Sequence, residues 1–287
     1  MLNPYQEEWK KNKWVKIITN DNKHIDITDM ENLYYLDFEE EEPKITQKTE
    51  QIEGTDGVIP NSASFEPFEL TLRFAFDGLD KTEYRLFKSN FRKLWARREP
   101  FYVVHSDLEG FKYAVIFNGL SFEDKFSKNG EIEVSLSVYK GYSESYLSTL
   151  ELDYWLKNGW QFENGLSIQD GVKYITDSKT VKIYNESSDE IDPDLRHTLV
   201  IKVKGNAPNG FKIKNKTNKK VYEYKKSIKN KDEIVINGVY TYKNKKRVTH
   251  NTNYKLITLE PGINNIEITG DGLELESLQF IFNFIYR

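Results

Sequence analysis

The sequence contains no cysteine and little histidine. Without a thiol, a chain of 287 residues can form no disulfide, bind no metal through sulfur and use no cysteine as a nucleophile. The four histidines are His24, His105, His197 and His250, and no pair has a metal-ligand spacing such as His-x-x-x-His. We therefore expect no metal site and no cofactor.

Sequence signals of a membrane span, of secretion and of common enzymes are also missing. No apolar run approaches the roughly 20 residues that a transmembrane helix needs. The first ten residues have no charged-then-apolar leader, so we expect no secretion signal. Nucleotide-binding glycine loops and the Gly-x-Ser-x-Gly nucleophile motif are absent, and Asp192-Pro-Asp194 is typical of a turn. We predict no catalytic residue and a protein that is not an enzyme.

The charge balance argues against nucleic-acid binding. The chain has 41 basic and 45 acidic residues, which gives a net charge of −4. Specific or non-specific binding to DNA rests on phosphate contacts from an excess of Lys and Arg, which this chain lacks. The 38% hydrophobic and 14% aromatic residues instead indicate a soluble, β-rich protein with room for two cores.

The most regular pattern is a strand, a helix and a second strand between Phe68 and His105. Apolar and polar residues alternate strictly over 68–76, which predicts a half-buried β-strand. Over 81–98 the apolar period becomes helical, and Asp80 with Glu83 resembles a capping box at the start of that helix. Pro100 ends the helix, and Phe101–His105 predicts the next strand. The predicted apolar stripe of the helix consists of Tyr84, Phe87, Phe91, Leu94 and Trp95.

Shorter signals complete the first half of the chain. Residues 14–18 and 24–27 predict a hairpin, and 44–53 predict a strand that ends in the turn Gly54-Thr-Asp-Gly57. Between them, Glu39–Glu42 form a run of like charge that is typical of a solvated loop. Strands are also expected over 111–117 and 131–139.

The second half is a series of short predicted strands with regularly spaced turn signals. Such a pattern is typical of an antiparallel sandwich or jelly roll. We therefore expect one domain over 1–142, a linker with a short helical turn over 143–159, and a second domain over 160–287. The predicted strands are 180–184, 198–204, 211–214, 221–224, 233–236, 254–259, 265–269 and 275–285.

Taken in order, these elements resemble the distal tail proteins of siphophages, the phages with long non-contractile tails. The residues that carry the resemblance are the Gly54–Gly57 turn, the strand 68–76, the helix segment 84–95, the segment 100–104 and the hairpin sequence 259–270. The resemblance implies a mainly β protein. Its N-terminal split β-barrel would carry one helix, and its C-terminal domain would be a galectin-like antiparallel β-sandwich.

The same resemblance implies a structural role in the virion. The N-terminal domains would form a homohexameric ring around the tail channel. The ring would join the tail tube protein to the tail-associated hub or lysin protein and to receptor-binding proteins. The protein would be made in the cytoplasm of the bacterial host and located at the tail tip, without a membrane and without specific nucleic-acid binding.

Three groups of residues are candidate contact sites. The polar face of the helix carries Arg85, Lys88, Arg92 and Lys93; it is either a solvated face or an interface with an acidic surface of a neighbouring subunit. The acidic run of Glu39, Glu40, Glu41 and Glu42 is either an exposed loop, a contact with a tail partner, or part of the channel wall, where it would keep passing DNA from binding.

The third group favours a different class of function. Aromatic faces stack on sugars, so Tyr240 and Tyr242, with Arg247 and His250, are candidates for carbohydrate binding, as is the pair Trp155 and Trp160. The alternative prediction is thus a carbohydrate-binding module that helps the virion adhere to the cell wall. No tryptophan follows Trp160, so structural roles for these residues are favoured.

Overall fold

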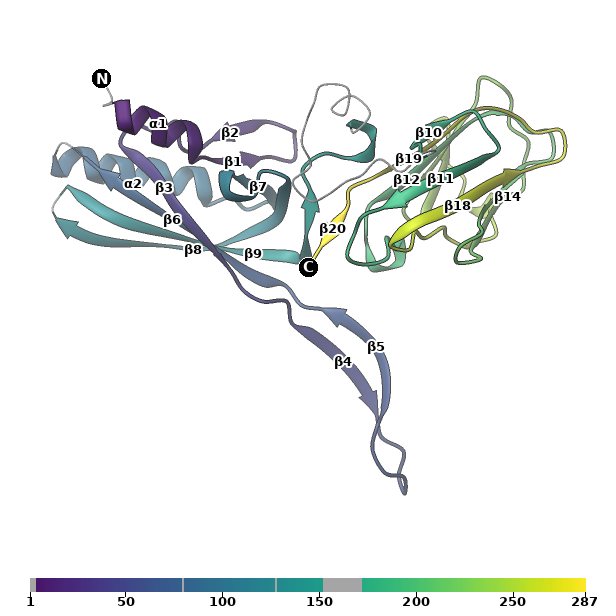
Figure 1. Ribbon diagram of the computed structural model, residues 1–287, viewed down its shortest axis with the longest axis horizontal. Coiled ribbons are helices and arrows are strands. Elements are labelled where there is room, and N and C mark those ends of the chain that lie inside the picture. The colour runs from purple at the N-terminus through teal and green to yellow at the C-terminus, as the bar shows by residue number, and fades with distance from the viewer. Residues whose placement is uncertain (1–3, 79, 127, 152–171) are drawn as a thin grey trace. The chain divides into compact units, whose positions relative to one another are not determined.

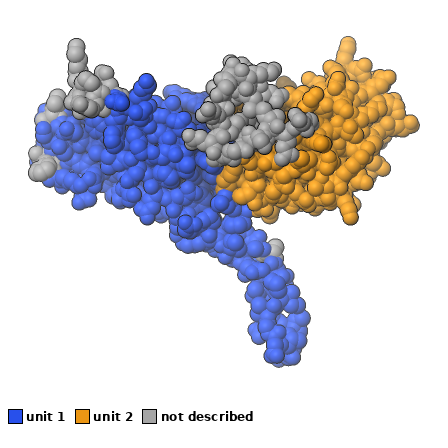
Figure 2. All heavy atoms as spheres, viewed as in Figure 1, with its two compact units in different colours: residues 1–146, 287 blue, residues 147–286 orange. Residues whose placement is uncertain are grey.

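A computed structural model describes residues 4–78, 80–126, 128–151 and 172–287. The chain divides into two compact units, residues 1–146 with Arg287 and residues 147–286 (Figure 2). The protein is mainly β, with antiparallel sheets in both units, as the sequence predicts. Within the described residues, no helix combines the length and the apolar character that a membrane crossing requires.

Unit 1 is built on one antiparallel sheet in the order β2-β1-β7-β8-β9-β6-β3 (Figure 1). The strands β8 and β9 are longer than predicted because their ladder continues beyond both ends of the apolar alternation. The bounds are β1 (Val15–Ile18), β2 (His24–Asp26), β3 (Leu33–Glu40), β6 (Phe68–Asp77), β7 (Phe101–His105), β8 (Phe111–Phe126) and β9 (Asn129–Ser145), with a 3₁₀ turn at η1 (Ser106–Leu108).

One face of this sheet is covered by the helix α2 (Lys81–Trp95). Asp80 caps the helix, since its carboxylate accepts from the backbone N–H groups of Thr82 and Glu83 at 2.7 and 2.9 Å. The helix buries Tyr84, Phe87, Phe91 and Trp95, as the stripe predicts. The ring of Phe87 stacks on Phe76 of β6 at 3.9 Å between centroids.

One detail of α2 differs from the prediction, and another was not predicted. The helix ends at Trp95 rather than at residue 98, because Ala96 leaves the helical region of the backbone and the Arg97 side chain donates to the carbonyl of Leu94. The N-terminal end of α2 lies close to the β8–β9 turn. A Cβ at Gly130 would meet the Tyr84 hydroxyl and would lie 2.8 Å from the carbonyl of Glu123, so only glycine permits this approach.

The structure also contains a helix that the sequence pattern did not predict, α1 (Pro4–Asn12). The helix has few apolar residues on any one face, so polar contacts with the sheet hold it in position. The Trp9 indole donates to the carbonyl of Tyr35 at 3.1 Å, and Lys10 donates to the carbonyls of Thr28 and Met30 at 2.9 and 2.6 Å.

The strands β4 (Ile45–Glu50) and β5 (Ile59–Phe65) form a separate two-stranded sheet. We call residues 44–66 the arm. It protrudes from the rest of unit 1 (Figures 1 and 2), and every residue of β4 is exposed. The predicted turn at Gly54–Gly57 lies at the tip of the arm, where both glycines have φ near +80° (83° and 79°).

Unit 2 consists of two antiparallel sheets, in the orders β10-β19-β12-β15-β16-β17 and β11-β18-β13-β14. The inward residues of the two sheets meet; for example, the hydroxyls of Tyr222 and Thr241 are 3.0 Å apart and both side chains are buried. The bounds are β10 (Ile175–Thr176), β11 (Thr180–Asn185), β12 (Leu199–Asn206), β13 (Phe211–Asn215), β14 (Val221–Tyr224), β15 (Glu233–Asn237), β16 (Tyr240–Lys243), β17 (Lys246–Arg247), β18 (Gly262–Thr269), β19 (Glu274–Phe282) and β20 (Ile285–Tyr286), with 3₁₀ turns at η2 (Pro193–Leu195) and η3 (Thr249–Asn251).

One predicted strand of unit 2, residues 254–259, is wrong. Tyr254 has a φ of 59°, and the carboxamide oxygen of Asn253 accepts from the backbone N–H of Lys255, so local side-chain bonds replace a ladder. Only Leu259 forms a bridge, to Ile191. Residues 143–145, the first of the predicted linker, belong to β9, whereas Trp155 and Trp160 lie outside the described residues.

Candidate assembly surfaces

The polar face of α2 carries the four basic residues that the sequence singled out. Lys88 is the least exposed of them: its ammonium lies 2.6 Å from the Asp124 carboxylate and 4.3 Å from the centre of the Tyr84 ring. The Arg92 guanidinium lies 5.2 Å from the centre of the Phe122 ring. Lys88 and Arg92 thus fasten the edge of the helix to β8.

Apart from Lys88, the cations of this face have no anionic partner in the described part of the chain, although Arg92 also packs on the Phe122 ring. In the described part of the chain, Arg85, Arg92 and Lys93 make no ion pair with a carboxylate. Leu86 lies among them and is 62% exposed. We call Arg85, Leu86, Arg92 and Lys93 the outer face of α2. It combines unpaired positive charge with exposed apolar surface.

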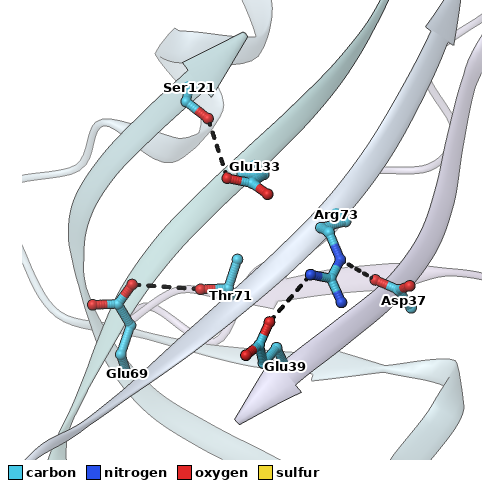
Figure 3. A network of polar contacts seen from close by, with 7 residues as sticks. All are labelled: Asp37, Glu39, Glu69, Thr71, Arg73, Ser121 and Glu133. Carbon is cyan, nitrogen blue, oxygen red and sulfur yellow. Dashed lines mark hydrogen bonds and ion pairs between the residues drawn. The ribbon is translucent and has the colours of Figure 1, made fainter. Parts of the chain in front are cut away.

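The acidic run is only in part the loop that its charge predicted, since Glu41 and Glu42 alone lie outside the strands. Glu39 and Glu40 belong to β3, where they pair with Thr71 and Leu70 of β6. Adjacent residues of a strand point to opposite faces, which separates neighbouring carboxylates and relieves their repulsion. The Arg73 guanidinium then binds both carboxylates of one face, Asp37 at 2.5 Å and Glu39 at 3.1 Å (Figure 3).

The other three glutamates of the run have separate surroundings. Glu40 accepts from the Tyr113 hydroxyl at 3.0 Å, and desolvation there raises the pKa of its carboxyl. Glu41 pairs with Lys44, and this hydrogen bond lowers the pKa of the Glu41 carboxyl. Glu42 is exposed. The four residues therefore do not act as one group.

A larger acidic surface lies on the face of the sheet that α2 does not cover. The registers of β3, β6, β9 and β8 bring its side chains to one side, and Figure 3 shows part of it, with hydrogen bonds from Thr71 to Glu69 at 3.4 Å and from Ser121 to Glu133 at 3.5 Å. We call it the acidic sheet face. Its six carboxylates belong to Asp37, Glu39, Glu69, Glu123, Glu131 and Glu133, and its bases are Arg73 and Lys125.

The sequence did not identify this face, because its residues come from four strands that only the register aligns. One signal was present: the alternation over 68–76 already placed Glu69 and Arg73 together on the polar side. The pairing of Arg73 with Glu133 of β9 and with Asp37 of β3 extends that side across the sheet.

The candidate sugar-binding residues of unit 2 lie together on β16, β17 and η3. The Arg247 guanidinium lies 4.1 Å from the centre of the Tyr240 ring and so covers one of its faces. A pocket of about 200 Å³ lies nearby, with Tyr222, Thr241 and Tyr254 in its wall, but none of Tyr240, Tyr242, Arg247 and His250 lines it. The four residues therefore do not belong to this pocket.

Chemical sites are not found among the side chains that the structure describes. There, no three His, Asp or Glu residues are grouped closely enough to hold a metal ion. His24 lies on β2 and His105 on β7 of unit 1, and His250 lies in η3 of unit 2.

The part of the chain that carries these surfaces is similar to a known family of phage tail proteins. Residues 25–138 match the family model described as the phage tail protein RIFT-related domain. This match contains most of the sheet of unit 1, the arm and α2. No curated protein matches the sequence.

The fold is similar to that of solved phage proteins. One similar structure is the crystal structure of the Dit protein of phage SPP1, described as a paradigm of the hub adsorption apparatus in phages that infect Gram-positive bacteria. The two sequences are 11% identical, and the structures superpose with a TM-score of 0.67 over 94% of this chain and 99% of the SPP1 protein. A chain of the phage P2 baseplate in its activated conformation with Ca is 11% identical with a TM-score of 0.49, covering 95% and 97%. The resemblance predicted from the sequence is confirmed.

Proposed function

We propose, from the premise that this chain is a structural protein of a phage tail or baseplate, that it forms a ring at the distal end of the tail. The ring would be a homohexamer built from unit 1. It would join the tail tube protein to the tail-associated hub protein, and unit 2 would face the receptor-binding proteins. In this proposal the protein resides in the virion and acts through its interfaces.

The observation that carries the proposal is the combination of a tail-protein domain with a fold shared over nearly the whole chain. The domain match covers 25–138, and the similarity to the SPP1 protein covers 94% of the chain. The surfaces of unit 1 are consistent with an assembly, since the arm, the outer face of α2 and the acidic sheet face are all exposed in a single chain.

We assign the acidic sheet face to the wall of the proposed channel. A wall that carries six carboxylates and two bases would repel phosphate groups, so DNA could pass without binding. Of the predicted acidic run, Glu39 belongs to this face. Glu40 is tied to Tyr113, and Glu41 and Glu42 lie at the root of the arm, where a contact with a tail partner is the fitting role.

The ring is tested by the mass of the purified protein. Light scattering over a range of concentrations should give six times the chain mass of 33.8 kDa, and negative-stain images should show particles with a central hole. A protein that remains monomeric at all concentrations, also when mixed with its tail tube and hub partners, would contradict the proposal.

The sugar-binding alternative receives no support from the geometry of its candidates. Arg247 occupies one face of Tyr240, and the four residues do not line the nearby pocket. We therefore propose no second function.

A further inference from the structure

The arm carries large apolar side chains that are exposed in the described part of the chain. Ile45, Ile52, Val58 and Ile59 are 60%, 52%, 55% and 46% exposed. A two-stranded hairpin without a packed face is at best marginally stable in water. Burial of these side chains against another surface would remove apolar area from water and stabilise the arm. The arm therefore has the properties of a docking element.

The root of the arm fixes its direction. Between the β3–β6 ladder and the β4–β5 ladder, the N–H of Glu41 donates to the carbonyl of Glu69, and the N–H of Glu66 donates to the carbonyl of Lys44, both at 2.9 Å. The arm thus continues two strands of the main sheet. Ten residues of extended chain from Lys44 to Gly54 span about 33 Å, far enough to reach an adjacent subunit.

The outer part of the arm carries charge of one sign. Residues 49–60 include Glu50, Glu53 and Asp56 and no basic residue. In the described part of the chain, none of these three carboxylates takes part in an ion pair. Ile52, Val58 and Ile59 lie between and beside them. The distal arm is therefore an acidic surface with apolar side chains.

The outer face of α2 has the complementary properties. Arg85, Arg92 and Lys93 have no carboxylate partner among the described residues, and Leu86 is the exposed apolar residue among them. We propose that the distal arm of one copy of this chain docks on the outer face of α2 of a second copy. This inference rests on the proposed ring and names the two surfaces that hold it together.

A second copy is the occupant that the charges favour, because one chain carries both complementary surfaces and leaves both exposed. Such an interface is heterologous: each copy gives its arm to one neighbour and receives an arm from the other. In a closed ring no arm and no helix face remains unpaired. Complementary charge also sets the orientation of the contact and speeds association.

Charge reversal tests the pairing. We expect Glu50→Lys with Glu53→Lys to abolish assembly at concentrations where the unmodified protein forms rings, and Arg92→Glu with Lys93→Glu to do the same. Combining all four changes should restore the rings, as measured by light scattering. The matched control, Lys182→Glu with Lys214→Glu on exposed strand positions of unit 2, should assemble normally.

The absence of cysteine permits a direct test of proximity. Two single-cysteine variants, Asp56→Cys and Ser89→Cys, are mixed and oxidised. We expect a disulfide-linked dimer that contains one copy of each, and much less product from either variant alone. Thermal melting of each variant checks that it is folded, which is expected because the arm lies outside the core.

The outcomes separate this inference from the proposed function. Rings that form normally in the charge-reversed variants, without the mixed disulfide, would overturn the docking of arm on helix and leave the ring intact; the arm would then belong to another tail protein. An unmodified chain that never assembles, even with its tail partners, would overturn both.

Discussion

His105 is a histidine held entirely inside an aromatic cluster. It is 0% exposed, its ring stacks on Tyr113 at 5.7 Å between centroids, and Phe38 lies 4.3 Å away. Neither ring nitrogen has a hydrogen-bond partner among the described residues. Burial lowers the pKa of His105 to about 4 from the usual 6.5, while the nearby Asp107 raises it and Lys13 lowers it by smaller amounts.

Because His105 is buried in this aromatic cluster, we predict that acid destabilises unit 1. The folded state keeps His105 neutral, whereas the unfolded chain takes up a proton below pH 6.5, so stability is complete above pH 6.5 and is lost as the pH falls toward 4. A lowering of this size corresponds to about 3 kcal/mol of unfolding free energy. Urea denaturation between pH 4 and 7 measures it.

The variant His105→Phe keeps an aromatic ring in the cluster and should flatten that part of the pH dependence. His24→Phe on β2, where the side chain is exposed, is the matched control and should retain the full slope. Equal slopes for the His105 variant and the unmodified protein would show that other groups carry the effect.

At the scale of elements, α2 depends on a single side chain for its first turn. The Asp80 carboxylate accepts from two backbone N–H groups that have no partner inside the helix. Its negative charge also lies at the positive end of the helix dipole. The cap therefore decides where the helix begins, and with it the place of the outer face of α2.

We expect Asp80→Ala to lower the unfolding free energy by about 1 kcal/mol, the usual cost of losing a cap. Asp80→Ser keeps an oxygen acceptor and should lose only part of that amount. Chemical denaturation followed by circular dichroism compares the two. An alanine variant as stable as the unmodified protein would mean that tertiary packing alone fixes the first turn.

The elements with strong internal periodicity were the ones that the sequence predicted well. The alternation over 68–76 became β6 because one face is in the core, and Asp80 began α2 as its residue type indicated. The sequence did not predict elements whose conformation depends on particular side-chain hydrogen bonds rather than on a periodic pattern. The helix α1 depends on carbonyls of Thr28, Met30 and Tyr35, and residues 254–259 follow local bonds of Asn253.

The candidate surfaces divide in the same way. The basic face of α2 was predictable, because the helical period alone assigns residues to its outer side. The acidic sheet face was not, because it depends on the registers of four strands. The run Glu39–Glu42 was misassigned as one loop because charge repulsion was weighed without Arg73, which is more than thirty residues away in the sequence.

At the scale of the whole molecule, the acidic and basic side chains of unit 1 lie on opposite faces. In unit 1, the sheet face opposite α2 is acidic, whereas the outer face of α2 is basic. The net charge of −4 conceals this separation. In a ring, each side would meet a different environment: phosphate-bearing DNA in the channel or the protein of a neighbouring subunit.

If the chain forms the proposed ring, we predict that removing negative charge from the acidic sheet face makes the ring bind DNA without preventing assembly. The variant carries Glu39→Gln, Glu69→Gln, Glu123→Gln and Glu133→Gln. Its binding to linear double-stranded DNA at low salt should rise and should fall again as salt increases, because phosphate contacts release counterions. Filter binding at several salt concentrations measures this.

The control for DNA binding changes the exposed Glu274 and Glu276 of unit 2 to Gln. It should bind no more DNA than the unmodified ring. If the two variants behave alike, the acidic sheet face does not line the channel.

The continuity of the arm with the main sheet has a mechanical consequence. Since β6 runs directly from the arm into the sheet, tension along the arm acts parallel to the β6–β9 ladder, which aligns ten residue pairs from Phe68 with Val138 to Asp77 with Asn129. A load in that direction shears the whole ladder at once instead of opening its hydrogen bonds one after another. The arm is thus attached to unit 1 in the geometry that best resists force along its length.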